Sequence, residues 1–450
     1  ESRSLIEEAN LLDKQNAAKS GLEDALCKRL DVQGSKFDAM LAKVEDVRSI
    51  ADPVGRVQMA TMLDEGLELH RVACPIGVIA VIFESRPEAA VQISSLALKS
   101  ANAIILKGGK EASHTNAALV GAIQAGLASL NARSGSKTPP AQAVQLVETR
   151  DEIGALLAMH GHIDLVVPRG SNALVSHIMA NTRIPVMGHA DGICSLFIDA
   201  AADSNVAVRV AADSKCDYPV ACNAVETLLL HEAVLGDVWP AIAIELVSRG
   251  VELRCDPQAI AALERRSEPL LSQAIANSKV LIASESDFKR EFLSLTAAVR
   301  CVTSVHEAVT HINSHGSHHT DTIVSEDTTA AAYFTANVDS AGVYVNASTR
   351  FADGQRYGFG AEVGVSTNRI HSRGPMGVEG LLIYKYILRG HGHCAADYSS
   401  GRSSFKHAPV EVLRHPPSHP LLPKQSSRVL IAIVVAAACG YMLGIRACRG

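Results

Sequence analysis

Hydrophobic and polar positions follow different rhythms in successive parts of the chain. Residues 1–54 place apolar side chains at helical spacing in a polar background, which predicts helices that end at Asp52-Pro53. Residues 57–72 contain strand-like stretches interrupted by Asp64-Glu65-Gly66, and this break predicts a hairpin turn. The chain is therefore expected to begin with helices followed by an antiparallel pair of strands.

The region after residue 76 repeats a short apolar run followed by a helical pattern. Strands are predicted at 77–83, 103–106, 143–147 and 163–167, and helices at 89–100, 116–130, 150–159 and 172–180. Near-continuous apolar strands joined by helices are typical of a parallel sheet covered on both faces. A second α/β region is predicted from 194 to 346, with a helix near 206–214 and strands at 225–230 and 343–345.

Ligands of open parallel sheets bind at the carboxyl ends of the strands. This rule draws attention to polar segments that follow three predicted strands of the first α/β region. They are Glu84-Ser85-Arg86, Lys107-Gly108-Gly109-Lys110 and Pro168-Arg169-Gly170-Ser171. We expect these segments to lie at one edge of the sheet.

The composition is that of a globular protein with more than one domain. A chain of 450 residues exceeds one ordinary core, so two or three domains are expected. The formal charge of −5 argues against a dedicated nucleic-acid binder. Ten cysteines without a CxxC pair indicate reduced thiols in a reducing compartment. Glu1 opens a helical pattern without a signal peptide, and we expect the natural polypeptide to begin further upstream.

The C-terminal part of the chain has a different composition. Residues 390–428 are rich in Ser, Pro, His and Arg and are predicted to form a linker. Residues 429–445 carry no formal charge, and as a helix they would extend over roughly 26 Å. We expect a transmembrane anchor here that holds the folded part on the cytoplasmic face of an intracellular membrane. A soluble helix is the alternative, and the flanking charges are too even to orient a span.

One cysteine lies where a nucleophile would be presented. Cys222 is in the segment 217–224, which follows a predicted helix, contains a proline-bearing turn and precedes a predicted strand. A thiol on such a turn can face a cleft and attack an electrophilic carbon. The alternative is a buried cysteine that packs as a small hydrophobic residue.

Several long motifs carry a family resemblance. The segments 184–194, 217–224, 346–354, 358–367 and 371–375 resemble the γ-glutamyl phosphate reductases, or glutamate-5-semialdehyde dehydrogenases, a branch of the aldehyde dehydrogenase superfamily. The segments 83–87 and 106–111 more closely resemble the reductase half of the bifunctional Δ1-pyrroline-5-carboxylate synthases. The resemblance covers roughly residues 1–390. It leaves open whether a glutamate kinase domain precedes residue 1.

The resemblance implies an aldehyde-dehydrogenase-like α/β fold with two main domains. An NADP-binding domain would cover 1–192, including an oligomerisation hairpin at 54–73, and a catalytic domain would cover 193–365. Residues 366–389 would return to a subunit interface. A homo-oligomer is expected because the hairpin leaves strand edges to be paired.

The resemblance also implies a reaction. The family reduces γ-glutamyl phosphate to glutamate semialdehyde and phosphate with NADPH, a step of proline biosynthesis. Cys222 would attack the acyl phosphate to form a thioester, which the hydride then reduces. The oxyanion of each adduct needs hydrogen-bond donors, for which the backbone N–H of Cys222, the neighbourhood of Asn223 and the side chain of Ser85 are candidates.

Cofactor and substrate residues follow from the same motifs. Lys107 and Glu111 would hold the adenosine ribose beside Gly108 and Gly109, and Lys110 would favour the 2′-phosphate of NADP, although no GxGxxG motif is present. The resemblance places Glu291 at the nicotinamide ribose. Independently of it, Gly170 and Ser171 open a predicted helix, where free N–H groups suit a cofactor phosphate. Residues implied for the substrate are Arg86, His189, Asn346, Ser348 and Arg350. Structural salt bridges are the alternative for the two arginines.

Three interpretations of function remain open from the sequence. The segment 189–192 has no glutamate where hydrolysing aldehyde dehydrogenases carry a base, which favours a reductase over an aldehyde oxidiser. A membrane-tethered scaffold without catalysis is the third possibility, suggested by the C-terminal segment and by Ser195. No metal is expected: the histidines His311, His315, His318 and His319 are interpreted as a polar loop because no cysteine ligand falls nearby in sequence.

Overall fold

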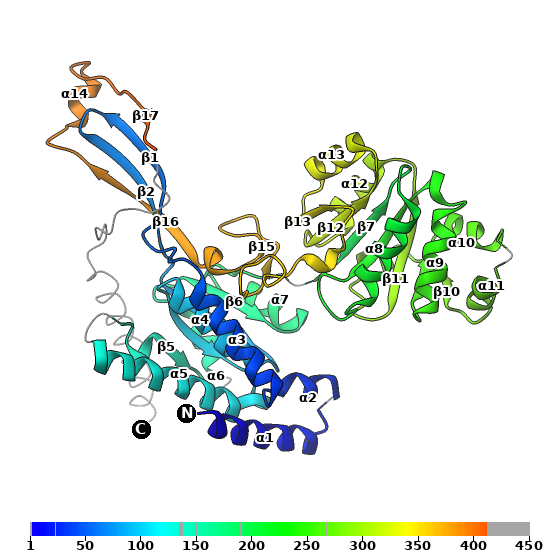
Figure 1. The fold of residues 1–450 in the computed structure, drawn as a ribbon, viewed down its shortest axis with the longest axis horizontal. Helices are drawn as coiled ribbons and strands as arrows, with labels where there is room; N and C mark the ends of the chain where they lie inside the picture. The colour runs from blue at the N-terminus through cyan, green and yellow to red at the C-terminus, as the bar shows by residue number, and fades with distance from the viewer. Residues whose placement is uncertain are drawn as a thin grey trace. The chain divides into compact units, whose positions relative to one another are not determined.

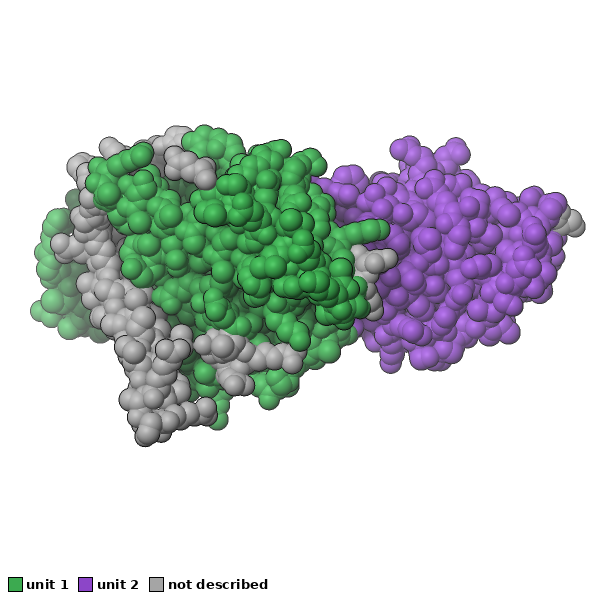
Figure 2. Space-filling view, turned by 90° about the horizontal axis from the view of Figure 1, so that it is seen from below, with its two compact units in different colours: residues 1–187, 359–364, 376–450 green, residues 188–358, 365–375 purple. Residues whose placement is uncertain are grey.

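The chain forms two compact units in the computed structural model (Figure 2). Unit 1 comprises residues 1–187, 359–364 and 376–450, and unit 2 comprises residues 188–358 and 365–375. The structure describes residues 2–22, 24–134, 138–148, 151–189, 191–266 and 268–411. The first division between the units follows Met187, whereas the sequence analysis places a domain boundary after residue 192.

Unit 1 contains a four-stranded parallel sheet (Figure 1). Its strands are β3 (Val78–Phe83), β4 (Ala103–Lys107), β5 (Val144–Leu146) and β6 (Leu165–Arg169), in the order β5-β4-β3-β6. Every side chain of β3 is buried, because alternate residues enter two separate cores. Ile79, Val81 and Phe83 pack on one face and Val78, Ala80 and Ile82 on the other. A strand buried on both faces explains the uninterrupted apolar run in the sequence.

Helices cover both faces of this sheet. They are α4 (Glu88–Lys99), α5 (Ser113–Ser134), α6 (Asp151–Ala158) and α7 (Asn172–Ala180). The polar N-terminal segment forms α1 (Arg3–Lys19), α2 (Asp24–Leu30) and α3 (Ser35–Ser49), as its periodicity predicts. These helices join unit 1 through a small apolar cluster that includes Ile6, Phe37 and Leu119.

Unit 1 also contains a four-stranded antiparallel sheet. The predicted hairpin forms β1 (Val57–Asp64) and β2 (Leu67–Pro75), and β16 (Leu382–Arg389) pairs with β2 over eight residues. The fourth strand of this sheet, β17 (Ala408–Pro409), pairs with β1 and follows α14 (Ala395–Ser399). The prediction of a linker over all of 390–428 is wrong for residues 395–399 and 408–409, because a strand pairing of only two residues leaves no periodic signal in the sequence.

Unit 2 is built on a seven-stranded parallel sheet in the order β10-β9-β11-β8-β7-β12-β13 (Figure 1). The strands are β7 (Cys194–Ile198), β8 (Val225–His231), β9 (Glu252–Cys255), β10 (Val280–Ile282), β11 (Thr296–Val302), β12 (Thr320–Val324) and β13 (Gly342–Val345). The helices are α8 (Ser204–Cys216), α9 (Val238–Ser248), α10 (Pro257–Glu264), α11 (Pro269–Ala276), α12 (Val305–His315) and α13 (Thr328–Asn337). A short antiparallel pair, β14 (Val365–Ser366) and β15 (Gly374–Pro375), completes the unit.

The two faces of this second sheet also have separate cores. Leu228 and Leu230 of β8 pack with Trp239 on one face, whereas Leu229 packs with Phe334 on the other. The expected α/β fold with parallel sheets is therefore confirmed. The expected membrane anchor at 429–445 lies outside the described residues. Among the residues that the structure does describe, no helix is long and apolar enough to span a membrane.

Candidate functional site

Three segments of unit 2 meet at the amino edge of its parallel sheet. Strands β8, β7 and β12 are neighbours, and the residues just before them are Cys222, Gly192 and His319. Because neighbouring strands are parallel, the segments that enter them lie at the same edge. This arrangement differs from the rule that ligands bind at the carboxyl ends of such sheets.

The turn that carries Cys222 is held by short-range and long-range contacts. The backbone N–H of Ala221 donates to Tyr218 at 3.1 Å, and that of Ala224 donates to Ala221 at 2.9 Å. The turn leaves the Cys222 side chain partly exposed. Beneath it, a Cβ at Gly192 would stand only 2.2 Å from the carbonyl oxygen of Cys222. The absence of a side chain at Gly192 therefore allows the two segments to approach this closely.

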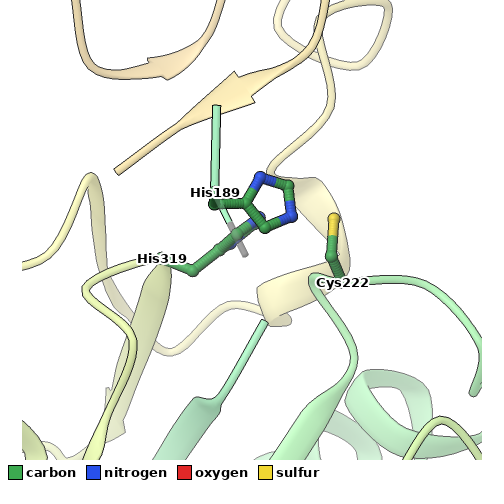
Figure 3. A group of neighbouring side chains, drawn as sticks. All are labelled: His189, Cys222 and His319. Atoms are coloured by element: carbon green, nitrogen blue, oxygen red, sulfur yellow. The ribbon is translucent and has the colours of Figure 1, made fainter. Parts of the chain in front are cut away.

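Two imidazoles accompany the thiol. The nearest ligand atoms of His189, Cys222 and His319 all lie within 4.8 Å of one another (Figure 3). His189 Nδ1 donates to the carbonyl oxygen of Val365 at 2.9 Å, and its ring lies edge-on to that of His319, with centroids 4.9 Å apart. A thiol with adjacent imidazoles has the donor set of a nucleophile with a nearby base.

His319 is the residue that the sequence analysis misses. Its side chain is 0% exposed, so the interpretation of this histidine as part of a polar loop is wrong. His319 comes directly before β12, a strand in which every residue is buried. Its position next to a buried strand is the feature of the sequence from which its burial could have been predicted. The missing information was that β12 pairs with β7, which follows Gly192 along the chain.

Four buried or half-buried cysteines of unit 2 are less suited to nucleophilic chemistry. Burial raises the pKa of Cys194 well above its ordinary value, and it also raises the pKa of Cys216 and Cys255. Burial raises the pKa of the Cys301 thiol to about 11. Since the thiolate is the nucleophilic form, these four sites are disfavoured relative to a turn at the sheet edge.

Asn223 and Arg350, which the sequence predicts as oxyanion and substrate residues, bind each other. The Arg350 guanidinium donates to the Asn223 side-chain oxygen, and Asn223 Nδ2 donates to the carbonyl oxygen of Ala352 at 2.9 Å. Arg350 is 8% exposed and also donates to Asp217 at 3.1 Å. This network ties both ends of the Cys222 turn to the segment that contains Arg350.

Ser348 and Asn346 also use their polar atoms within unit 2. The Ser348 hydroxyl accepts from the Ser214 hydroxyl at 3.1 Å and from the Arg350 N–H at 3.2 Å. The Asn346 side chain exchanges two hydrogen bonds with the backbone of Ser325, at 2.9 and 3.0 Å. These contacts organise the segment after β13, a role that the sequence analysis did not foresee.

Glu291 lies close to the same edge of the sheet. Burial raises the pKa of its carboxyl group, which accepts a hydrogen bond from the backbone N–H of Gly192 and interacts electrostatically with His189. Gly192 therefore contacts both the predicted nucleophile and the glutamate predicted to bind the nicotinamide ribose.

The polar segments of unit 1 meet at the carboxyl ends of β4, β3 and β6. Ser85, after β3, donates to the Glu111 carboxylate from its backbone at 2.6 Å and from its hydroxyl at 2.9 Å. Lys107 ends β4, is 5% exposed and donates to the carbonyl oxygen of Gly108. A Cβ at Gly109 would stand 2.0 Å from the Glu111 carboxylate. The Ser85 hydroxyl, predicted to stabilise an oxyanion, thus donates a hydrogen bond to Glu111, which is predicted to bind a ribose.

The start of α7 completes this edge. Ser171 caps the helix by accepting from the Leu174 N–H at 3.4 Å, and its own N–H donates to the Glu84 carboxylate at 2.9 Å. A Cβ at Gly170 would stand 2.5 Å from the same carboxylate. Arg86, two residues after Glu84 in sequence, is partly buried. The segments that the carboxyl-end rule selects do lie together.

The chemistry of this edge fits a dinucleotide. Lys107 and Lys110 offer positive charge for phosphates, and the Glu111 carboxylate can accept from ribose hydroxyls. Lys110 is exposed and has no ion-pair partner among the described residues. The Glu84 carboxylate occupies the N–H of Ser171, so a phosphate at the start of α7 would have to displace it.

Comparisons with known proteins find relatives over most of the chain. The aldehyde dehydrogenase family model matches residues 28–259. A probable γ-glutamyl phosphate reductase of Schizosaccharomyces pombe is 48% identical over 399 residues, covering 88% of this chain and 85% of that protein. The γ-glutamyl phosphate reductase of Saccharomyces cerevisiae is 47% identical over 412 residues, covering 90% of each chain. The crystal structure of γ-glutamyl phosphate reductase from Thermotoga maritima is similar with a TM-score of 0.80 and 36% identity, covering 87% of this chain and 90% of that chain.

Proposed function

The chain belongs to the γ-glutamyl phosphate reductase family of the aldehyde dehydrogenases, and from this membership we propose that it reduces γ-glutamyl phosphate to glutamate semialdehyde and phosphate in proline biosynthesis. The observation that carries the proposal is the position of Cys222. It lies on a partly exposed turn beside two imidazoles, whereas burial raises the pKa of Cys194 nearby.

Cys222 is the proposed nucleophile. Its thiolate attacks the acyl carbon, a C–S bond forms, the C–O bond to phosphate breaks, and phosphate leaves with the bonding electrons. When bound, the nicotinamide cofactor supplies the hydride that reduces the resulting thioester. The C–S bond of the thiohemiacetal then breaks, which releases the aldehyde and returns Cys222 as a thiolate.

Neighbouring residues are proposed to position this sulfur. Gly192 sets the depth of the turn by contact with the Cys222 backbone, and the Asn223–Arg350 pair fixes its far end. The backbone N–H of Cys222 is the proposed oxyanion donor, because the side chain of Asn223 is bonded to the carbonyl oxygen of Ala352. The imidazole of His189 is proposed to contact the substrate beside the sulfur.

The remaining predicted residues keep proposed roles in binding. Lys107, Glu111 and Lys110 would hold the adenosine end of the cofactor, with Lys110 favouring the 2′-phosphate of NADP. Arg86 would bind an anionic group of the substrate, and Glu291 would bind the nicotinamide ribose. Arg350, Asn346 and Ser348 are better suited to organising unit 2, because their polar atoms bond within it.

The reverse reaction tests the proposal. Purified protein should reduce NADP⁺ with glutamate semialdehyde only when phosphate is present, and Cys222→Ala should lower kcat by at least about 10³-fold. Cys301→Ala, which removes a half-buried cysteine from β11 of the same unit, should retain activity. Full activity of Cys222→Ala would remove this sulfur from the mechanism.

The same assay separates the rival functions. Phosphate-independent oxidation of the aldehyde would favour the aldehyde oxidiser, which needs a base to activate water against the thioester. Absence of activity in both the wild type and Cys301→Ala, with intact folding, would favour a scaffold without catalysis.

Assembly and location are further parts of the proposal. A homo-oligomer would form through the edge strands of the antiparallel sheet, β16 and β17. It would also cover the exposed side chains of Tyr384, Tyr386 and Leu388. Light scattering tests this assembly. The proposed anchor at 429–445 would place the full-length chain in the membrane fraction of lysates. The full-length reading frame tests whether a glutamate kinase domain precedes residue 1.

A further inference from the structure

We propose that His189, Cys222 and His319 form a binding site for Zn²⁺ or a similar borderline-soft divalent cation, and that an ion bound there switches off the nucleophile. One ligand atom from each of the three side chains lies within 4.8 Å of the other two (Figure 3). The residues come from segments that enter three neighbouring strands, so the sheet itself holds the three positions together.

The second observation that points to a ligand is a buried nitrogen of His319 that has no hydrogen-bond partner among the described residues. This side chain is 0% exposed, and its Nε2 has no hydrogen-bond partner within the described part of the chain. Leaving a buried polar atom unpaired costs about 1–3 kcal/mol. Figure 3 shows the His319 ring extending toward His189 and Cys222. A cation bound between these residues would satisfy the unpaired nitrogen.

Both imidazoles are oriented in the way that metal-binding histidines usually are. The ring nitrogen of such a histidine that does not bind the metal is normally held by a hydrogen bond. Nδ1 of His189 donates to the carbonyl oxygen of Val365 at 2.9 Å, and Nδ1 of His319 shares a hydrogen bond with the Thr320 hydroxyl, also at 2.9 Å. In both rings this arrangement assigns Nε2 to the ion.

The distances require only a small closure. Ligand atoms around tetrahedral zinc are separated by roughly 3.5 Å, as follows from Zn–N and Zn–S bonds of about 2.0 and 2.3 Å. The separations here reach at most 4.8 Å. His189 is only partly buried, so a movement of its side chain by about 1 Å is sterically feasible.

The donor set determines the class of cation and the consequence of binding. Two imidazoles and one thiolate favour Zn²⁺, Co²⁺ and Cd²⁺ over Mg²⁺ and Ca²⁺, which prefer oxygen ligands. Binding requires the thiolate of Cys222 and withdraws its lone pair from attack on an acyl carbon. The inhibitory consequence rests on the proposed function, whereas binding of the ion does not.

Cobalt binding tests the site without reference to activity. The full chain, freed of metals with EDTA and kept reduced, should bind Co²⁺ with a thiolate-to-metal charge-transfer band, and Zn²⁺ should abolish that band. Cys222→Ser should eliminate the band, and His319→Gln and His189→Gln should each weaken Co²⁺ binding by at least about 100-fold. His189→Gln, at a partly exposed position, remains informative if loss of the buried His319 impairs folding.

Two matched variants serve as controls. His318→Asn removes the adjacent histidine, which bonds instead to the carbonyl oxygen of Asp339, and asparagine tolerates the positive φ of 60° at this position. Cys194→Ala removes the buried thiol that lies 3.7 Å from His319 Nδ1 and donates to the carbonyl oxygen of Cys222 at 3.3 Å, so it tests whether the neighbouring cysteine supplies the thiolate ligand. Both variants should bind Co²⁺ as the wild type does. Absence of the band in the wild type, or its persistence in Cys222→Ser, would overturn the proposal.

An activity measurement then tests the switch. Zn²⁺ should inhibit the phosphate-dependent reduction of NADP⁺ in wild type and His318→Asn, EDTA should restore the rate, and Mg²⁺ should have no effect. Cobalt binding without inhibition by Zn²⁺ would refute the switch. A chain that binds Co²⁺ through Cys222 but has no activity even with EDTA would support the metal site and refute the proposed function instead.

Discussion

The strongest prediction about catalysis follows from the close approach of Gly192 to the backbone of Cys222. A Cβ at Gly192 would stand 2.2 Å from the carbonyl oxygen, 2.6 Å from Cα and 2.7 Å from the carbonyl carbon of Cys222. Ordinary van der Waals contact begins near 3.4 Å, so Gly192→Ala must separate the two segments by about 1.2 Å. All three atoms belong to the backbone, so no rotation of a side chain can relieve the clash.

The expected effect is larger on catalysis than on folding. A displacement of about 1 Å at a reacting group costs on the order of 100-fold in rate, so kcat of Gly192→Ala should fall by about that factor. Overpacking of this kind usually costs about 1–3 kcal/mol in the free energy of unfolding, and the variant should still fold. The same shift should change the rate at which iodoacetamide alkylates Cys222.

The assay combines steady-state kinetics, urea denaturation and mapping of the alkylated cysteine. Gly236→Ala is the matched control, because a Cβ at this unit 2 glycine would meet no atom within 4 Å. A kcat of Gly192→Ala within about a factor of two of the wild-type value, with unchanged alkylation of Cys222, would refute the reasoning.

Two further predictions concern stability. Lys215 and Glu226 are both 0% exposed and form an ion pair with a distance of 2.7 Å. Lys215→Met leaves the buried carboxylate without its partner and should lower the free energy of unfolding by about 3–5 kcal/mol, and the additional change Glu226→Leu should restore much of this loss. A loss below about 1 kcal/mol for Lys215→Met in urea denaturation would contradict the prediction. Burial lowers the pKa of His311 from 6.5 to about 3. As the pH falls below 6.5, the unfolded chain takes up a proton at this histidine and the folded chain does not, so the free energy of unfolding decreases. At pH 5 wild type should have lost about 2 kcal/mol more than His311→Phe, and equal pH profiles of urea denaturation would exclude this effect.

Local patterns were sufficient to predict the parallel strands of unit 1, the helices that cover them and the hairpin of β1 and β2, but not β16, α14 or β17. The run that forms β3 is apolar at every position because both faces of the strand are buried, and the polar turn at 64–66 lies between β1 and β2. The pairing of β16 and β17 with this hairpin joins segments more than 300 residues apart, and no local pattern records it. The sequence therefore predicted the hairpin strands β1 and β2 of the antiparallel sheet, but not the two strands that pair with them.

Residue roles were harder to predict than residue positions. The motif containing Asn346, Ser348 and Arg350 does lie in the same unit as Cys222, as the resemblance implied. However, a polar side chain in a motif can bind either a ligand or its own fold, and the residue type does not distinguish the two. Arg350 illustrates this: it is 8% exposed, and its guanidinium bonds to Asp217 and Asn223.

The neighbourhood of Cys222 depends on strand order, which a single sequence does not contain. Gly192 and His319 are far apart along the chain, yet both adjoin Cys222 because β7 pairs with β8 on one side and β12 on the other. Had β12 been placed elsewhere in the sheet, every predicted helix and strand would be unchanged, but His319 would lie away from the sulfur. The chemistry proposed for Cys222 therefore has two sources. The motif supplies the thiol, and the order of the parallel strands supplies the imidazole beside it.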